Sequence, residues 1–142
     1  AAEGALFRLW LRVLGVTDTS GLDVIVRAAA RAYGIARRPG RLLLALRVPE
    51  LVFPAPQAGN IQALPGEARD ALAVMREEAR AALITVRDGL EPEHLPALLP
   101  LVMVEPYLRA QERMADPLHR VVDVAPLARV SRIWWAHVRG RI

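Results

Sequence analysis

Three arginines lie close together in the first third of the chain, at Arg37, Arg38 and Arg41. They form a basic cluster in a chain of 142 residues whose 19 basic and 15 acidic residues give a net charge of +4. A guanidinium group offers several N–H donors in a fixed plane, and this arrangement suits the oxygens of a phosphate group. We therefore predict that these three arginines bind either a diphosphate group or an anionic lipid.

Carboxylate pairs that could hold a divalent cation are missing from the sequence. A helix supplies such a pair when two aspartates lie three or four residues apart on one face. No two aspartates of this chain have that spacing. Glu77 and Glu78 are adjacent, so they point to different sides of a helix and are expected to be solvated charges. The sequence therefore predicts no metal ligand and no bound cofactor in the chain.

The other titratable and nucleophilic residues indicate structural roles. Asp116, His119 and Asp123 surround an Asp-Pro turn, and a loop of this kind gives no fixed ligand geometry. His94 is expected to be exposed at a helix start, and His137 to interact with the dipole at a helix C-terminus. The chain has no cysteine, and neither serine lies in a nucleophile elbow. We therefore predict no catalytic residue.

Composition favours a single all-α domain over 1–142. Apolar residues make up 54% of the chain and aromatic residues only 5%, and the abundant Ala and Leu favour helices. No uncharged apolar run approaches the roughly 20 residues of a membrane-spanning helix. With no signal peptide recognisable and no cysteine, we expect a cytoplasmic protein that associates peripherally with a membrane surface. The scattered arginines argue against nucleic-acid binding.

Apolar residues recur at helical spacing along the chain. We expect helices over 4–14, 22–33 and 67–88, with Gly15 and Gly89 ending the first and the last. Gly34 and Pro39 are expected to interrupt the chain before a short buried helix over 42–46. Residues 48–66 are rich in Pro and Gly and predict a long loop.

The last third of the chain predicts two helical regions joined by a turn. Residues 92–114 are apolar but contain three internal prolines, so we expect one kinked helix or two short ones. A final helix over 126–138 places Leu127, Val130, Ile133, Trp134 and His137 on one side. Of Trp134 and Trp135, we expect one to lie in the core and the other to be half exposed.

These C-terminal segments are similar to a known protein family. The Pro-punctuated apolar stretch after His94, the Asp116-Pro117 turn and the Trp134-Trp135 helix resemble the end of the squalene/phytoene synthases. Upstream, Arg38-Pro39-Gly40-Arg41 aligns with part of an R-G-R segment of that family. The resemblance covers nearly the whole chain and is strongest over 67–142. It implies an antiparallel helical bundle of the isoprenoid (terpenoid) synthase type, with 1–142 forming one domain that lacks the family's N-terminal part.

The resemblance also carries expectations about function. Squalene/phytoene synthases join two prenyl diphosphates head to head with Mg²⁺ held by Asp-rich motifs, and this chain lacks those motifs. The resemblance therefore implies an isoprenoid-binding protein that is inactive by itself, with a prenyl diphosphate or isoprenoid lipid as ligand. It implies that several apolar side chains line an isoprenoid cavity or belong to the core: Leu72, Met75, Leu99, Val102 and Met103.

Two interpretations stay open at this point. In the first, the chain is the C-terminal part of a prenyltransferase-type enzyme. In the second, it resembles the members of the superfamily that have lost the Asp motifs and act as assembly factors for respiratory complex I, with a protein as partner.

Overall fold

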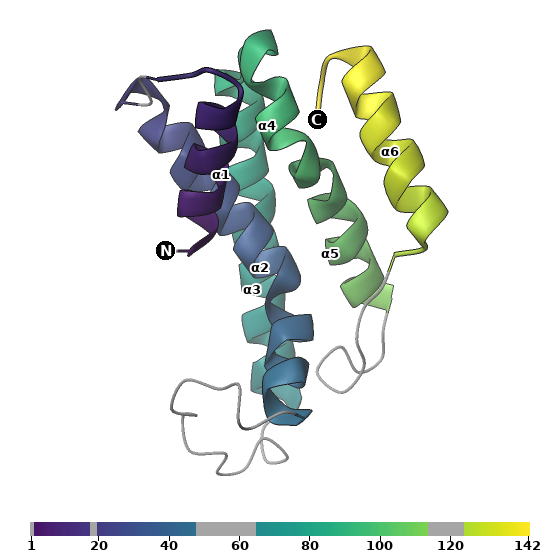
Figure 1. Cartoon of the computed structure of the whole chain (residues 1–142). Coiled ribbons are helices and arrows are strands. Elements are labelled where there is room, and N and C mark those ends of the chain that lie inside the picture. The colour runs from purple at the N-terminus through teal and green to yellow at the C-terminus, as the bar shows by residue number, and fades with distance from the viewer. Residues whose placement is uncertain (1, 18–19, 48–64, 114–123) are drawn as a thin grey trace.

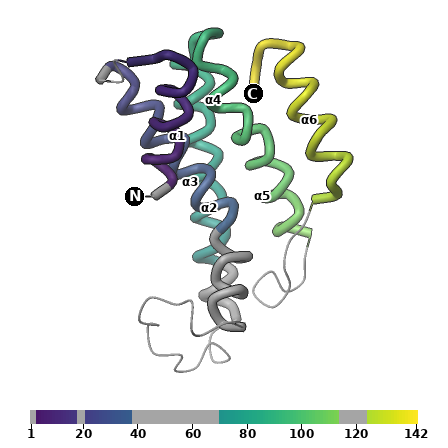
Figure 2. The backbone as a smooth tube through the Cα atoms, in the orientation of Figure 1, coloured from purple at the N-terminus to yellow at the C-terminus, as the bar shows by residue number. Residues whose placement is uncertain are grey.

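The computed structural model describes residues 2–17, 20–47, 65–113 and 124–142, and within these ranges it contains helices and no strand (Figure 1). The predicted all-α class is confirmed. The helices are α1 Ala2–Val13, η1 Ser20–Leu22, α2 Asp23–Arg47, α3 Pro65–Gly89, η3 Pro92–His94, α4 Leu95–Leu98, η4 Leu99–Met103, α5 Val104–Arg113 and α6 Pro126–Arg139. Figure 2 shows that α2 and α3 run in opposite directions and that α5 and α6 do the same. Residues 48–64 of the predicted loop lie outside the described residues.

Glycine ends the first and the last helix, for the same physical reason. Gly15 has φ 89° and Gly140 has φ 67°, a left-handed conformation that glycine adopts without a Cβ clash. After α1, the Val16 N–H donates to the carbonyl of Leu11 at 3.0 Å, and after α6 the Arg141 N–H donates to Ala136 at 3.2 Å. These bonds satisfy carbonyls that each helix end would otherwise leave unpaired. The predicted stop at Gly15 is confirmed.

The core lies where α1, α2, α3 and the segment from α4 to α5 meet. Its largest fully buried side chains include Phe7 and Leu11 of α1 and Leu98, Leu101 and Leu108 of the later helices. Small side chains dominate where α2 packs along α3, and these let the two helices approach closely: Ala29, Ala32, Ala36, Ala79 and Ala82. No described helix is both long and apolar enough to cross a membrane.

The predicted interruption of α2 at Gly34 and Pro39 is wrong, because α2 continues to Arg47 as one helix of 25 residues. Proline removes one backbone N–H from a helix and crowds the preceding turn. Packing along α3 offsets this local cost, since α2 makes its most extensive contacts with that helix. The segment expected as a separate short helix over 42–46 is therefore the last part of α2.

Of the two alternatives predicted for 92–113, the structure is closer to two short helices than to one kinked helix. The region is, however, divided into more than two pieces. It consists of short 3₁₀ and α-helical pieces, η3, α4, η4 and α5. Pro92, Pro96, Pro100 and Pro106 each lie in the first turn of one of these pieces. A first-turn proline breaks no intrahelical bond, because N–H groups at that position have no partner in the helix. The prolines therefore divide the region into short pieces.

A buried hydrogen bond ties α5 to α2. The Gln111 side chain is only 3% exposed, and its Nε2 donates to the Ala36 carbonyl at 2.8 Å. We expect Gln111→Met to lower the free energy of unfolding by about 1 kcal/mol, because the volume is kept while the donor is lost. Urea denaturation of both proteins measures the difference. An unchanged or higher free energy of unfolding would show that this bond does not stabilise the packing of α5 on α2.

Candidate functional site

The structure places the predicted diphosphate-binding arginines on α2, and it describes one of their three side chains. Arg37 is exposed, and its Nη1 donates to the Tyr33 hydroxyl at 2.8 Å. The Arg37 guanidinium also lies 5.3 Å from the centre of the Tyr33 ring, a cation–π contact. Arg38 and Arg41 follow at helical spacing on α2, and their side chains lie outside the described residues. Tyr33 therefore holds Arg37 in place at the surface of the helix.

Three carboxylates converge on a single arginine between α3 and α5. We call this group the Arg80 cluster: Arg80, Glu77, Glu105, Glu112 and Arg109. The Arg80 guanidinium donates to Glu77 at 2.7 Å, to Glu105 at 3.2 Å and to Glu112 at 2.7 Å. Arg109 donates a further bond of 2.8 Å to Glu105. The positive charge among these three carboxylates is thus a guanidinium of the protein itself.

The Arg80 cluster favours the ionised form of Glu105. Partial burial alone would raise the pKa of Glu105, but hydrogen bonds from Arg109 and Arg80 outweigh it, so this pKa lies below its usual value of 4.5. The hydrogen bond to Glu112 raises the pKa of Arg80 above its usual value, against the opposing effect of burial. Sequence reasoning missed the cluster, although one signal was present. Glu105, Arg109 and Glu112 have the helical spacing that brings charges to one face.

The other acidic side chains of α2 and α3 for which partners are described also face arginine. Asp23 pairs with Arg8 at 2.9 Å, and Glu78 pairs with Arg31 at 3.0 Å. Glu77 and Glu78 are both exposed, as expected for solvated charges, and each also accepts a hydrogen bond from an arginine. These pairs are half exposed, so their contribution to stability is small.

His94 is buried, and its predicted exposure is therefore wrong. It ends the 3₁₀ turn η3, and the apolar residues that follow it in α4 carry it inward. Its Nε2 lies 3.4 Å from a carboxylate oxygen of Glu93, and its Nδ1 lies 3.9 Å from one of Glu91. The Nδ1 atom is buried without a hydrogen-bond partner among the described residues.

Within the described part of the chain, Glu91, Glu93 and His94 bring three ligand atoms within 4.8 Å of one another and could hold a metal ion. The two nitrogens of His94 face different carboxylates, however, and a metal ion bonds to only one of them. The arrangement resembles an imidazole between two exposed acids more than a closed ligand set. Asp116, His119 and Asp123 lie outside the described residues.

The apolar residues proposed as an isoprenoid cavity are mostly packed. Met103 is buried, while Leu72, Met75, Leu99 and Val102 are half buried. The enclosed space beside Leu11, Val26 and Leu98 has no room for a water molecule. An open groove of about 290 Å³ lies between α1 and α6, and apolar side chains form its walls: Trp10, Val13, Leu14, Pro96, Leu99 and Ile133. This groove is open and apolar, so it could admit an isoprenoid tail.

The last helix differs from its prediction in orientation. Its boundaries agree, but Leu127, Val130, Trp134 and His137 are exposed, and Ile133 is half buried. Trp134 and Trp135 are both about half exposed, so neither lies in the core. Ala136 supplies the buried position instead, where α6 packs on η4.

Comparisons with known proteins identify no relative of this chain. Protein-family models give no match, and searches of curated proteins and of solved structures give none either. The resemblance to squalene/phytoene synthases therefore remains a prediction from the residues quoted above.

Proposed function

We propose that this chain is a squalene/phytoene synthase-like helical domain that binds prenyl diphosphates without condensing them. The proposal that the chain does not condense its ligand rests on the hydrogen bonding of the carboxylates in the Arg80 cluster. Ionisation of an allylic diphosphate needs divalent cations held against the phosphates by carboxylates. In this protein Glu77, Glu105 and Glu112 are hydrogen-bonded to Arg80, so a cation would have to displace a guanidinium.

The binding part of the proposal rests on Arg37 and on the open apolar groove. The Arg37 guanidinium is exposed on α2 and held against Tyr33, so it can contact a phosphate oxygen with little loss of side-chain freedom. The groove between α1 and α6 offers apolar walls to an isoprenoid tail. A second candidate, an assembly factor for respiratory complex I, is favoured by the exposed tryptophans of α6, as in a protein that acts by docking.

Purified protein incubated with farnesyl or geranylgeranyl diphosphate and Mg²⁺ is expected to release no pyrophosphate and to form no squalene-type or phytoene-type product. A known condensing enzyme in the same assay is the positive control. Equilibrium dialysis should detect weak retention of farnesyl diphosphate that inorganic pyrophosphate displaces. We expect Arg37→Gln to weaken this retention roughly threefold, because it removes one charge-assisted contact.

Arg87→Gln is the matched control for binding, because Arg87 is an exposed arginine of α3 that bonds the Ile142 carbonyl. Equal loss in both variants would mean that retention reflects net charge and not a site on α2. Turnover that a chelator abolishes would contradict the non-catalytic proposal and would require a metal held by residues outside the Arg80 cluster.

A further inference from the structure

One side of α6 exposes five large apolar side chains, which together we call the α6 apolar face. These side chains are between 50% and 85% exposed: Leu127, Val130, Trp134, Trp135 and Val138. Their spacing along the helix repeats every three or four residues, so they form one continuous stripe. Ser131 interrupts the stripe, but its hydroxyl donates to the Ala128 carbonyl at 3.2 Å and is thus bonded to the helix itself. A contiguous apolar stripe on a protein surface is typical of a site that contacts another protein or a membrane.

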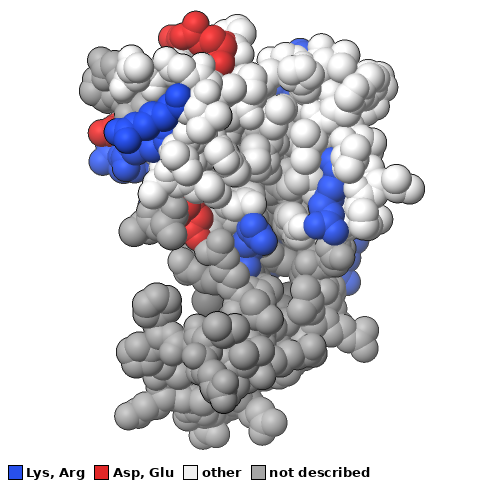
Figure 3. Space-filling model, in the orientation of Figure 1, with Lys and Arg blue, Asp and Glu red and all other residues white. Residues whose placement is uncertain are grey.

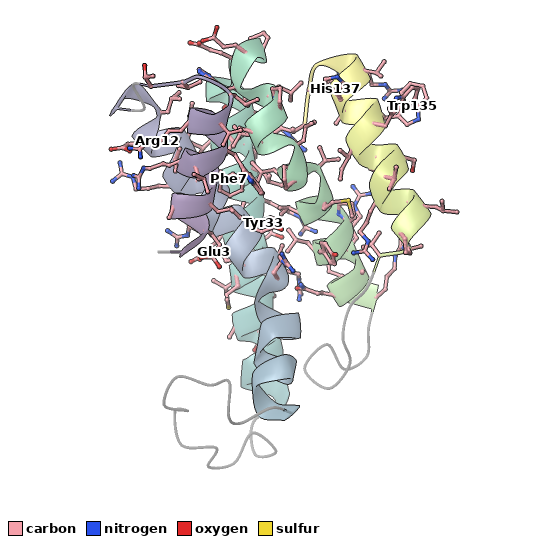
Figure 4. All side chains as sticks on the ribbon, in the orientation of Figure 1. Glu3, Phe7, Arg12, Tyr33, Trp135 and His137 are labelled. Atoms are coloured by element: carbon pink, nitrogen blue, oxygen red, sulfur yellow. The ribbon has the colours of Figure 1, made fainter. Side chains whose placement is uncertain are left out.

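The α6 apolar face points away from the helical bundle. Ala136 is buried on the opposite side, where α6 packs on η4. Figure 4 shows Trp135 directed outward from α6, on the side remote from α1 and α2. The bundle therefore holds α6 with its apolar stripe presented outward, and no described segment covers that stripe.

The charged side chains of residues 124–142 are all of one sign. Residues 124–142 contain four arginines and no acidic side chain: Arg129, Arg132, Arg139 and Arg141. In Figure 3 the surface over α6 carries basic atoms and no acidic ones. A helix with an exposed apolar stripe whose charged side chains are all basic complements a surface that has an apolar interior and an anionic exterior.

The tryptophans strengthen this complementarity. Trp134 and Trp135 contact each other edge to face with ring centres 5.3 Å apart, and the Arg139 guanidinium lies 4.8 Å from the centre of the Trp135 ring. Tryptophan prefers the headgroup level of a bilayer because its ring is apolar while its N–H needs a polar partner. Arginine beside it can bond lipid phosphates while its methylene groups stay on the apolar side.

We propose that α6 is a docking helix for an anionic lipid bilayer, lying in the plane of the interface with its apolar face among the acyl chains. This inference goes beyond the proposed function and does not depend on it. A second copy of the chain is a poorer occupant. A two-fold pairing of α6 would bring its arginines toward those of the partner copy without an acidic side chain on either helix to compensate.

Flotation with vesicles tests the proposal on the full chain. We expect the protein to float with vesicles of phosphatidylcholine mixed with phosphatidylglycerol at least about tenfold more strongly than with phosphatidylcholine alone, because each arginine near an anionic surface adds favourable energy. Raising the salt concentration should reduce this preference, since it screens the charges. Equal binding to both kinds of vesicle, or binding to neither, would overturn the proposal.

Two sets of variants locate the contact. The triple variant Leu127→Ser, Val130→Ser, Trp134→Ser is expected to lose vesicle binding about tenfold or more, because it removes apolar area that would enter the bilayer. The matched control is Val74→Ser, Ile84→Ser, which changes two apolar side chains of α3 that are 60% and 55% exposed. It should bind vesicles like the wild-type protein. All five positions are exposed, and circular dichroism of each variant checks that its helices are kept.

Light scattering of the same samples gives the mass of the protein. It thereby tests the alternative that a second copy of the chain covers the α6 apolar face. Without vesicles the wild-type protein should be monomeric, and the α6 triple variant should also have the mass of a monomer. A stable dimer that the α6 triple variant abolishes would overturn the proposal in favour of self-association. Equal vesicle binding by the triple variant and by the α3 control would also overturn it, because the lipid contact would then lie elsewhere.

Discussion

Replacing Phe7 with alanine is expected to lower the free energy of unfolding by about 4 kcal/mol. Phe7 is 0% exposed and joins α1 to α2 through an edge-to-face contact with Tyr33, whose ring centre is 5.8 Å away. A second edge-to-face contact, at 5.4 Å, packs it against Trp10 on its own helix. Figure 4 shows Phe7 and Tyr33 on adjoining helices. Alanine would lose both aromatic contacts and leave a cavity that the alanine-rich neighbouring surfaces are poorly able to fill.

Leu9→Ala is the control for this prediction, because Leu9 lies two residues further along α1 and is 56% exposed. Its expected cost is below about 0.5 kcal/mol. Guanidinium denaturation followed by circular dichroism gives both values. A loss for Phe7→Ala no larger than that for Leu9→Ala would mean that α1 is not anchored to the bundle through its aromatic side chain.

Helix positions were predictable from local signals wherever those signals agreed. The apolar residues that repeat along α3 are Leu72, Met75, Ala79, Leu83 and Val86. The last three are buried as this spacing predicts, while Leu72 and Met75 are half buried. Gly15 ended α1 as predicted, because its left-handed conformation needs no information from the rest of the fold. Pro39 was misleading, since packing along α3 outweighs the local cost of a proline within α2.

The orientation of α6 and the burial of His94 depend on distant parts of the chain. Helix α6 has apolar residues on two sides, and periodicity does not decide which side packs on η4. The small Ala136 faces the bundle and the large Trp134 does not, which is the reverse of what side-chain size suggests. His94 was expected to be exposed because it follows Glu93 at a predicted helix start, yet the 3₁₀ turn directs it inward. Both outcomes follow from the packing of the α4–η4 segment.

The candidate site was predicted only in outline. Arg37 was identified from its cluster with two other arginines, but its contact with Tyr33 four residues earlier on α2 was not. The Arg80 cluster was missed because its members come from helices α3 and α5, which are far apart in sequence. The sequence assigned anion binding to the arginines at 37, 38 and 41 alone and predicted no ion pairs for the others. In the structure several arginines instead bind the protein's own carboxylates.

Arg80→Met is expected to lower the free energy of unfolding at neutral pH by about 2 kcal/mol. Methionine keeps most of the apolar stem of arginine but leaves Glu77, Glu105 and Glu112 without their shared guanidinium. The expected cost is below that of a fully buried pair because the Arg80 side chain is 27% exposed. Arg31→Met is the matched control, because Arg31 pairs with Glu78 at the surface, and this change should cost less than about 0.5 kcal/mol.

The effect of Arg80→Met should shrink in acid, and the sign follows from Glu105. The pKa of Glu105 is lower in the folded protein than its usual 4.5, so its contribution to stability is present above that value. This contribution disappears as the pH falls through the folded pKa, because the protonated carboxyl no longer attracts Arg109 and Arg80. The Arg80→Met variant lacks the part of this contribution that comes from Arg80, so its free energy of unfolding falls less in acid. Denaturation measured at neutral pH and at about pH 3 should therefore show the two proteins converging in acid. A constant difference between them would indicate that Arg80 stabilises the fold through the packing of its stem and not through its charge.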